Sequence, residues 1–287
     1  MKKFSWYAAR SVQDAQDHVK NTVSELLSGN GDGSTAVYKA GGIDLLDLMK
    51  EGLVNPEKVV HVQSIPGLDE ITFEERSGMQ IGANVTLAKL EADPSVRQYY
   101  TALHQAIAHA GTPQLRNLAT LGGNLAQRTR CWYFRSIDHV CYRKGSGTCF
   151  AQEGENGLHA IIRNQPCASV HSSSVATALM AFHAEVEIAS KKGKRRRVEM
   201  EDFFVHPEVD SRKENVLEPG DLITAVIIPP PSKNTGSAYI KFGARESHDW
   251  SMADVAVVME RNGSRCTHAE IVLGAAAPVP VKAREAA

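Results

Sequence analysis

Apolar and polar positions near the start of the chain switch between the period of a strand and the period of a helix. STAVYKAGG (34–42) predicts a short strand that ends in a glycine pair, and IDLLDLMKEG (43–52) repeats its apolar residues at helical spacing. Gly52 stands where a helix commonly ends, and KVVHV (58–62) then predicts a buried strand. Residues 1–62 are therefore predicted to form an N-terminal α/β lobe.

Shorter periodic segments follow. EITFEE (70–75) and MQIGAN (79–84) predict strands joined by a Ser-Gly turn. Helical spacing appears in TLAKLEADPSV (86–96), in YYTALHQAIAHAG (99–111) and, behind capping serines, in SSSVATALMAFHA (172–184). QLRNLATLGGN (114–124) has the composition of a loop.

Strand-like alternation dominates the rest of the chain. The segments are AEVEIAS (184–190), LITAVIIPPP (222–231), AYIKFGARES (238–247), ADVAVVMERNG (253–263) and HAEIVLGAAA (268–277). Proline cannot donate to a sheet ladder, so the triplet Pro229–Pro231 marks a boundary. The predicted class is α+β, with a second lobe over residues 63–228 and an antiparallel β domain over 229–287.

Composition and charge exclude several classes of protein. With 43% hydrophobic residues and a formal net charge of -1, the chain lacks the positive field that nucleic acid or acidic lipid attracts. The basic run KKGKRRR (191–197) separates two alternating segments, AEVEIAS and VEMEDFF, and is predicted to be a solvated turn between strands. No Ser/His/Asp order, HExxH or Walker loop appears, so no catalytic residue is proposed.

The same survey bears on location. No apolar stretch approaches the roughly 18–20 residues of a membrane span, and the N-terminus lacks the apolar centre of a signal peptide. We therefore expect a cytoplasmic protein that has no membrane partner. A periplasmic location is expected only if a partner that carries the signal exports it.

Two glycine pairs are candidate anion sites. Ala40-Gly41-Gly42-Ile43-Asp44 stands at the predicted strand-to-helix turn, where backbone N–H groups and a helix N-terminus can approach a phosphate. Thr120-Leu121-Gly122-Gly123-Asn124 repeats the pair among hydrogen-bonding neighbours. Either pair alone is explained as well by a tight turn, but two such loops together favour a cofactor that contains a diphosphate.

Four of the five cysteines fall between positions 131 and 167. Their spacing, C-x9-C-x7-C-x17-C, has none of the close CxxC pairs typical of zinc sites. Spacing alone leaves unrelated buried cysteines, an iron–sulfur cluster and zinc as alternatives. The surrounding basic and glycine residues favour a loop around an anionic cluster; they are Arg128, Arg130, Arg135, Arg143, Lys144, Gly145 and Gly147. Cys266 is predicted to be a lone strand cysteine.

Three motifs together carry a family resemblance. KAGGIDLL (39–46), GTPQLRNLATLGGNLAQRTRCWYFR (111–135) and KFGARESHDW (241–250) resemble the FAD-binding (medium) subunits of the molybdenum hydroxylases, which include xanthine dehydrogenase and carbon monoxide dehydrogenase. The resemblance extends from about Phe4 to the end of the chain. It implies two α/β lobes that hold FAD between them and a C-terminal domain of antiparallel strands and helices. The helical part of that domain is missing here, so this domain is expected to be shortened.

The resemblance also implies which residues contact FAD. The pyrophosphate would be wrapped by Lys39, Ala40, Gly41, Gly42, Ile43, Asp44 and Leu45, and met from the second lobe by Thr120, Gly122, Gly123 and Asn124. Gly111 and Thr112 would lie near the same cofactor, Lys241 close to the flavin ring, and Ile223 against the isoalloxazine. Relatives commonly read HPSD where this chain reads His171-Ser172-Ser173-Ser174, so Ser174 replaces an aspartate that reaches FAD.

For the cysteines, the resemblance is to a particular insert. Most medium subunits lack this loop, but those of the periplasmic-type aldehyde oxidoreductases and of 4-hydroxybenzoyl-CoA reductase carry an insert that binds an extra [4Fe–4S] cluster. Residues 128–168 look like that insert, closest to the aldehyde oxidoreductase version. This implies Cys131, Cys141, Cys149 and Cys167 as the cluster ligands.

The function implied is electron transfer within a complex. A large partner subunit would oxidise an aldehyde, N-heterocycle or other aromatic substrate at a molybdenum cofactor, and a small partner with [2Fe–2S] clusters would pass electrons to FAD here and on to an acceptor. The assembly would be a heterotrimer or a dimer of heterotrimers. Two alternatives are a scaffold or assembly subunit that has lost FAD, and a stand-alone flavoprotein oxidase, which the lack of a catalytic base near the flavin motifs disfavours.

Overall fold

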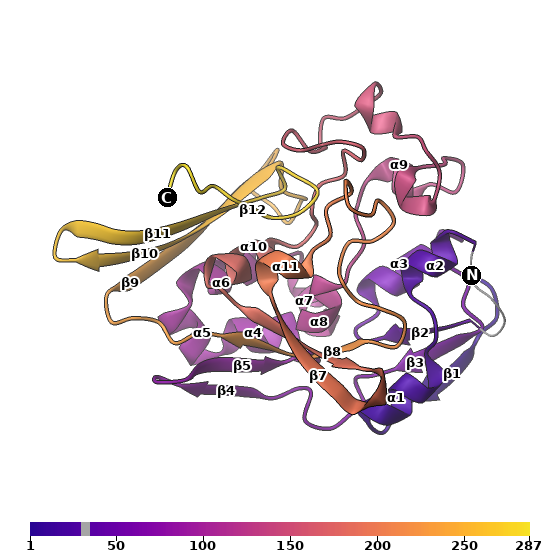
Figure 1. Ribbon diagram of the computed structural model, residues 1–287, viewed down its shortest axis with the longest axis horizontal. Coiled ribbons are helices and arrows are strands. Elements are labelled where there is room, and N and C mark those ends of the chain that lie inside the picture. The colour runs from indigo at the N-terminus through magenta and orange to yellow at the C-terminus, as the bar shows by residue number, and fades with distance from the viewer. Residues whose placement is uncertain (30–34) are drawn as a thin grey trace.

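The computed structural model describes residues 1–29 and 35–287, and its strands form three sheets (Figure 1). The first sheet is parallel, in the order β1-β3-β2. Its elements are β1 (Ser5–Ala8), α1 (Val12–His18), α2 (Val23–Leu27), β2 (Ala36–Lys39), α3 (Ile43–Lys50) and β3 (Lys58–His61). The predicted strand–helix–strand unit is confirmed, although Ser34 lies outside the described residues. The pattern did not reveal β1.

Glycine sets both ends of α3. Gly42 precedes the helix with φ 83° and Gly52 follows it with φ 79°, conformations that a side chain would strain. Between them, Leu45, Leu48 and Met49 form the buried face of the helix. The helix therefore begins at the glycine pair and packs back onto the sheet.

The second sheet has five antiparallel strands in the order β4-β5-β8-β6-β7, and helices α4, α6 and α10 lie over one of its faces (Figure 1). Its strands are β4 (Ile71–Glu74), β5 (Gly78–Gly82), β6 (Glu185–Ser190), β7 (Lys194–Glu199) and β8 (Leu222–Ile228). The helices are α4 (Leu87–Ala92), α5 (Pro94–Tyr99), α6 (Thr101–Ala108), α7 (Pro113–Leu118), α8 (Leu121–Leu125), α9 (Trp132–Arg135), α10 (Ser174–Ala181) and α11 (Met200–Phe203). Short 3₁₀ turns are η1 (Tyr142–Lys144), η2 (Phe150–Gln152) and η3 (Lys191–Gly193).

Two local predictions in this part were wrong. The supposed loop 114–124 is helical, because Thr112 caps α7 with Pro113 at its first position and Thr120 caps α8. The basic run is a turn only at its start. Residues 194–197 belong to β7, where Arg195 pairs with Glu187 on β6 at 2.8 Å, and the supposed next strand breaks into α11.

The third sheet is antiparallel, in the order β12-β11-β10-β9. Its strands are β9 (Thr235–Phe242), β10 (Ala253–Asn262), β11 (Arg265–Gly274) and β12 (Val281–Lys282). Helices α6 and α10 pack against it. The α+β class is confirmed, whereas the domain boundaries at 62 and 228 stay a prediction. Within the described residues, no helix has both the length and the apolar character to cross a bilayer.

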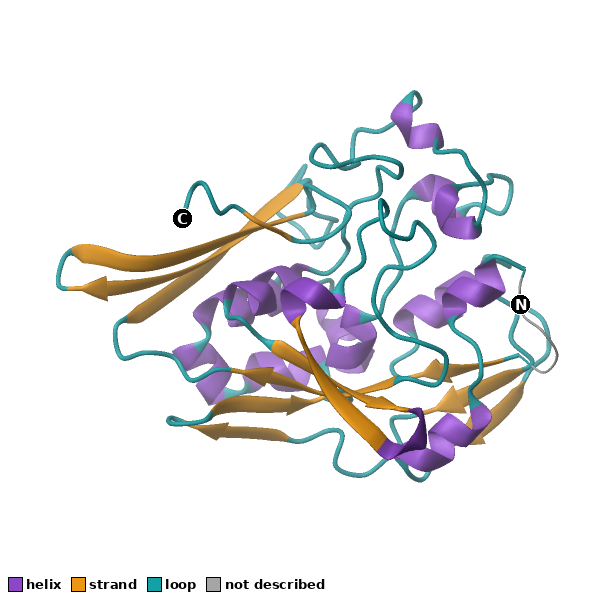
Figure 2. Ribbon diagram, in the orientation of Figure 1, coloured by secondary structure: helices purple, strands orange, loops and turns teal. Residues whose placement is uncertain are grey.

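The segment between α8 and α10 is mostly irregular loop (Figure 2). It nevertheless has a fixed place, because Phe134 and Cys141 are buried in one apolar cluster with Leu48 and Met49 of α3. The cysteine-rich residues 128–168, called the cysteine loop below, therefore pack on the first lobe.

The packing of the β2–α3 turn yields a stability prediction. A Cβ built on Gly41 would overlap the backbone carbonyl of Leu118, which cannot rotate away. We expect Gly41→Ala to lower the free energy of unfolding by about 1–3 kcal/mol, measured in urea. The control is Gly236→Ala, where nothing lies within 4 Å of the new Cβ. Equal stability of the two variants would contradict the contact.

Candidate functional site

The two glycine pairs, far apart in sequence, meet in the structure. The β2–α3 turn lies against the connection between α7 and α8, and a Cβ on Gly123 would be 3.9 Å from the Cβ of Ala40. Thr120 accepts a hydrogen bond from the Gly123 N–H at 3.2 Å, which holds the second glycine turn in place. The loops predicted to approach one anion are thus neighbours.

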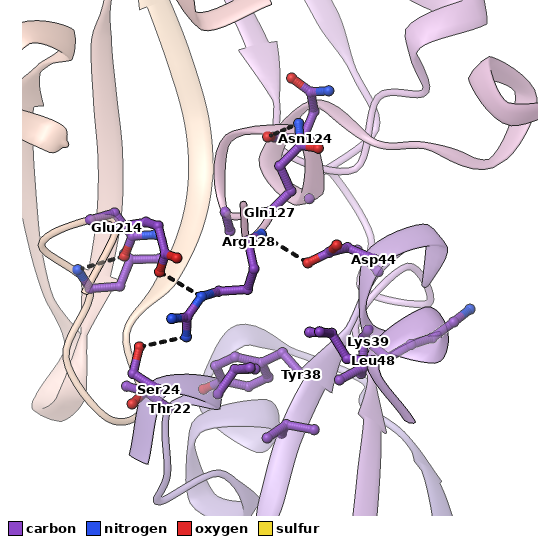
Figure 3. Close-up of a pocket in the computed structure, with 18 of the residues that line it drawn as sticks. Thr22, Ser24, Tyr38, Lys39, Asp44, Leu48, Asn124, Gln127, Arg128 and Glu214 are labelled. Carbon is purple, nitrogen blue, oxygen red and sulfur yellow. Dashed lines mark hydrogen bonds and ion pairs between the residues drawn. The ribbon is translucent and has the colours of Figure 1, made fainter. Parts of the chain in front are cut away.

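A cavity of about 240 Å³ opens beside this contact (Figure 3). Ten predicted residues line it: Lys39, Ala40, Gly41, Gly42, Ile43, Asp44, Leu45, Thr120, Gly123 and Asn124. Residues 21–24 and the loop 213–221 before β8, neither of which the sequence pattern indicated, also contribute to its wall.

A second cavity of about 480 Å³ is lined by four of the six remaining predicted positions, Gly111, Thr112, Ser174 and Lys241. It shares Ile43, Ala119, Asn124, Gln127 and Arg130 with the first cavity. Because the two share these walls, they lie side by side between the lobes, and together they are called the two-part cleft below.

Gly122 and Ile223 do not line either cavity. Gly122 donates its N–H to the carbonyl of Ala83 at 2.8 Å and packs against that residue. Ile223 lies on β8, between β5 and β6, and is 5% exposed within the core. The expectation that Ile223 lies beside the cofactor therefore does not match its buried position.

Arg128 connects three segments at the first cavity (Figure 3). Its guanidinium donates to Ser24 of α2 at 2.9 Å and pairs with Glu214 at 2.5 Å. Its backbone N–H donates to Asp44 of α3 at 2.9 Å. The side chain is nearly buried, so these contacts fix the cavity wall.

Asp44 extends the connection to the cysteine loop. Its Oδ1 lies 2.5 Å from Nη2 of Arg135 and 3.2 Å from Nη2 of Arg130. Arg130 in turn stacks over the Trp250 ring, 5.0 Å from its centroid. Asp44, predicted as part of a phosphate loop, thus also holds the cysteine loop against α3.

Ionisable groups in the second cavity have shifted pKa values. Burial lowers the pKa of Lys241, whose ammonium donates to the backbone carbonyls of His109 and Asp249. Burial raises the pKa of the Asp254 carboxyl and lowers that of His171 to about 3, the nearby Arg143 adding to the His171 shift. His171 is therefore neutral at pH 7.

Sequence reasoning missed Asp254 and Trp250, and left His171 without a role. Asp254 could have been found from the sequence, because it is a charged residue at an inward-facing position of an alternating strand. His171 Nε2 is buried and has no hydrogen-bond partner among the described residues. A buried polar atom without a partner at a cavity wall suits a polar ligand.

Ser174 is the first residue of α10 and lines the second cavity, whereas Ser173 is the N-cap of the helix. Ser173 accepts from the Ala176 N–H at 3.0 Å and donates to the Asn124 side chain at 2.5 Å. This bond ties the second glycine turn to α10. The Ser174 side chain is consequently not needed to cap the helix.

The four cysteines of the loop come together. Cys149 and Cys167 share a hydrogen bond, which raises the pKa of the Cys149 thiol and lowers that of Cys167 to about 5, with the Arg143 charge also lowering the latter. Burial is the main cause that raises the pKa of Cys131 to about 11, and Cys141 and Cys167 add to it. Cys131 also lines the second cavity, and His159 Nε2 lies 3.2 Å from its Sγ. Cys266 is exposed on β11, as expected for a lone strand cysteine.

Glu214 offers a prediction about stability. Its carboxylate faces the nearly buried Arg128 and also Arg143, which lies 3.8 Å from its Oε1. We expect Glu214→Gln to lower the free energy of unfolding, measured in urea, by about 3–5 kcal/mol, because buried guanidinium groups lose their counter-charge. The matched control is Glu208→Gln, whose partner Arg163 is half exposed, with an expected cost below about 1 kcal/mol. A similar loss of unfolding free energy in both variants would rule out a buried ion network.

Comparison with known proteins supports this reading of the cleft. The family described as FAD binding domain in molybdopterin dehydrogenase matches residues 2–231. The aldehyde oxidoreductase FAD-binding subunit PaoB of Escherichia coli (strain K12) is 37% identical over 248 residues, 85% of this chain and 76% of the relative. The nicotine 6-hydroxylase medium subunit of Paenarthrobacter nicotinovorans is 30% identical over 266 residues, 93% of this chain and 72% of the relative.

Solved structures agree with the sequence matches. A chain of carbon monoxide dehydrogenase from Hydrogenophaga pseudoflava superimposes with a TM-score of 0.71 at 26% identity, covering 99% of this chain and 79% of that one. The match leaves about a quarter of the length of most of these curated relatives uncovered, and the nicotinate dehydrogenase FAD-subunit of Eubacterium barkeri is matched over 65% of its length. The resemblance to this family is confirmed. The chain belongs to the family of FAD-binding domains of the molybdopterin dehydrogenases, as a FAD-binding subunit of an oxidoreductase of the molybdenum hydroxylase type.

Proposed function

We propose that this subunit holds FAD in the two-part cleft and a [4Fe–4S] cluster in the cysteine loop, and passes electrons between partner subunits and an acceptor. The observation that carries the proposal is the position of Cys131, which belongs to the cysteine set and also lines the cavity that contains Lys241. The two groups would then be neighbours within one chain.

The residues of the first cavity fit a diphosphate. Helix α3 begins at Gly42 without a side-chain cap, so no side chain competes for the N–H groups of its first turn. Ile43, Asp44 and Leu45 of that turn line the cavity. Uncapped N–H groups and the positive end of the helix dipole are what a phosphate needs.

The second cavity fits the flavin end of the cofactor. It offers the Trp132 and Trp250 rings, the ammonium of Lys241 and the unpaired His171 Nε2. FAD, when bound, supplies the chemistry of accepting electrons singly and releasing them in pairs. The chain's residues would position the cofactor: Lys241 places a positive charge at this end, and the Trp132 and Trp250 rings offer apolar surface to the flavin.

The cysteine loop fits a cluster better than a single zinc ion. Ligand sulfurs of a tetrahedral zinc ion lie about 3.8 Å apart. No three of the four sulfurs lie within 4.8 Å of one another, although the thiols perturb one another's pKa values. A larger iron–sulfur cube spreads its ligands more widely. The Arg143 charge contributes to the lowered pKa of Cys167, and Lys144 opposes the rise that burial causes in the pKa of Cys141; such cations stabilise thiolates around an anionic cluster.

The partners proposed are those of the named relatives. We propose a large subunit that binds the molybdenum cofactor and oxidises an aldehyde, since an aldehyde oxidoreductase FAD-binding subunit is 37% identical, and a small subunit that carries [2Fe–2S] clusters. A heterotrimer is the simplest assembly. The scaffold alternative differs in one respect, because it requires that the chain bind no FAD.

The FAD site can be tested with two glycine substitutions, one at the first cavity and one away from it. We expect Gly123→Val to weaken FAD binding at least about tenfold, since the new side chain would crowd Thr120 and enter the first cavity. The control is Gly157→Val, where nothing lies within 4 Å of an added Cβ. Binding is measured by flavin fluorescence titration. A wild-type chain that retains no flavin after desalting would instead favour the scaffold.

The cluster can be tested with substitutions of two cysteines, one inside the proposed ligand set and one outside it. We expect about four irons per chain, as a cube with four thiolate ligands implies. Cys167→Ser should lose them and keep FAD, whereas Cys266→Ser should keep both. Iron and flavin are quantified on the same anaerobically purified samples. Flavin without iron in the wild-type chain would contradict the cluster and indicate that the four cysteines have only a structural role.

A further inference from the structure

Two histidines and a glutamate gather where α10 meets the C-terminal sheet, away from the two-part cleft. Nε2 of His183 lies 3.4 Å from Oε1 of Glu270, and Nε2 of His268 lies 3.7 Å from the same oxygen. Among the described residues, this is the one group of three or more potential metal-ligand side chains whose ligand atoms all lie within 4.8 Å of one another.

His183 occupies a backbone position that normally favours glycine. The His183 N–H donates to the Met180 carbonyl and the Ala184 N–H to the Leu179 carbonyl, the two bonds of a Schellman helix end. His183 then has φ 53°, in the left-handed region. Glycine would hold this turn without strain, so the turn itself does not require the imidazole.

The other two side chains come from β11. His268 and Glu270 are two residues apart on the strand, so both side chains leave the same face. Glu270 pairs with Val258, which is buried, so this face is the inner one that α10 covers. Lys282 lies 3.8 Å from Oε2 of Glu270, which leaves Oε1 to face the histidines.

We propose that His183, His268 and Glu270 form a binding site for a divalent transition-metal ion of the zinc class. Two imidazole nitrogens and a carboxylate oxygen are ligands that this class prefers. At metal–ligand distances of about 2.0–2.2 Å, tetrahedral ligand atoms lie about 3.3–3.6 Å apart. The observed 3.4 and 3.7 Å from the histidines to Glu270 need only small adjustments, and the two histidine nitrogens lie within 4.8 Å of each other. The histidines are 49% and 51% exposed, which leaves coordination positions open to water.

The ion would link two parts of the molecule. His183 follows α10 of the second lobe, and the other ligands belong to the C-terminal sheet. At its other end α10 presents Ser174 to the second cavity, and the same sheet carries Lys241 there on β9. A metal bound at this junction would therefore brace two elements that line the cleft. The proposal does not depend on the cysteine loop or on FAD.

The test is zinc binding by equilibrium dialysis of the full chain as purified with its cofactors. The wild-type chain is expected to bind one Zn²⁺ that both His183→Gln and His268→Gln weaken at least about tenfold. His104→Gln on α6 and Cys266→Ser on β11 are matched controls that should leave this zinc unchanged. Zinc retained with undiminished affinity by both histidine variants, or no zinc on the wild-type chain, overturns the proposal.

A second variant separates binding from folding. His183→Gly removes the ligand but relieves the left-handed backbone, so the metal-free variant is expected to unfold at an equal or higher temperature. Added Zn²⁺ should raise the unfolding temperature of the wild-type chain and leave that of His183→Gly unchanged. An equal zinc-induced rise in both would show that the ion binds elsewhere.

Discussion

Both candidate cofactor sites depend on one nearly buried carboxylate, that of Glu214. It lies between the Arg128 guanidinium at the first cavity and the Arg143 guanidinium in the cysteine loop. Among the described residues, this contact sets two buried guanidinium groups against one carboxylate, and a buried cation is costly unless anions compensate it. The phosphates of FAD on one side and cysteine thiolates on the other are the anions that this chain is organised to receive.

Asp44 joins the same parts from the first lobe. It begins α3 beside the glycine pair, accepts the backbone N–H of Arg128 and pairs with Arg135. The phosphate-facing turn and the cysteine loop are consequently held by one side chain. Since Cys131 also lines the second cavity, a displaced cysteine loop would change the shape of the cleft. The ion pairs of Asp44 hold the loop whether or not a cluster is bound, so the cleft is expected to keep its shape when the iron is lost.

The sequence predicted what local periodicity and glycine chemistry determine. Strand β2, helix α3 and strand β3 follow from residues within 28 positions of one another, and the two glycine turns lie where the motifs placed them. The α7–α8 segment was missed because its Gly, Asn and Thr content suggests a loop, whereas threonine caps and tertiary packing make it helical. The exposed strand β1 was missed because SWYA carries no clear alternation.

Tertiary contacts decided the rest of the site. Glu214 reaches Arg128 across 86 positions of sequence, and no periodic pattern marks such a pair. His171 and Asp254 are distant in sequence yet line one cavity, and only packing of α10 against the third sheet brings them together. For Ile223, the role that the motif implied stays a prediction, and its place on a strand buried between two others could not be read from the motif.

The most direct test is an anomalous-difference map at the iron absorption edge from crystals of the purified subunit with FAD bound. We expect iron density enclosed by Cys131, Cys141, Cys149 and Cys167, and the flavin ring in the second cavity between Trp132 and Lys241. Iron absent from the cysteine loop, or a flavin ring lying outside this cavity, would contradict the account.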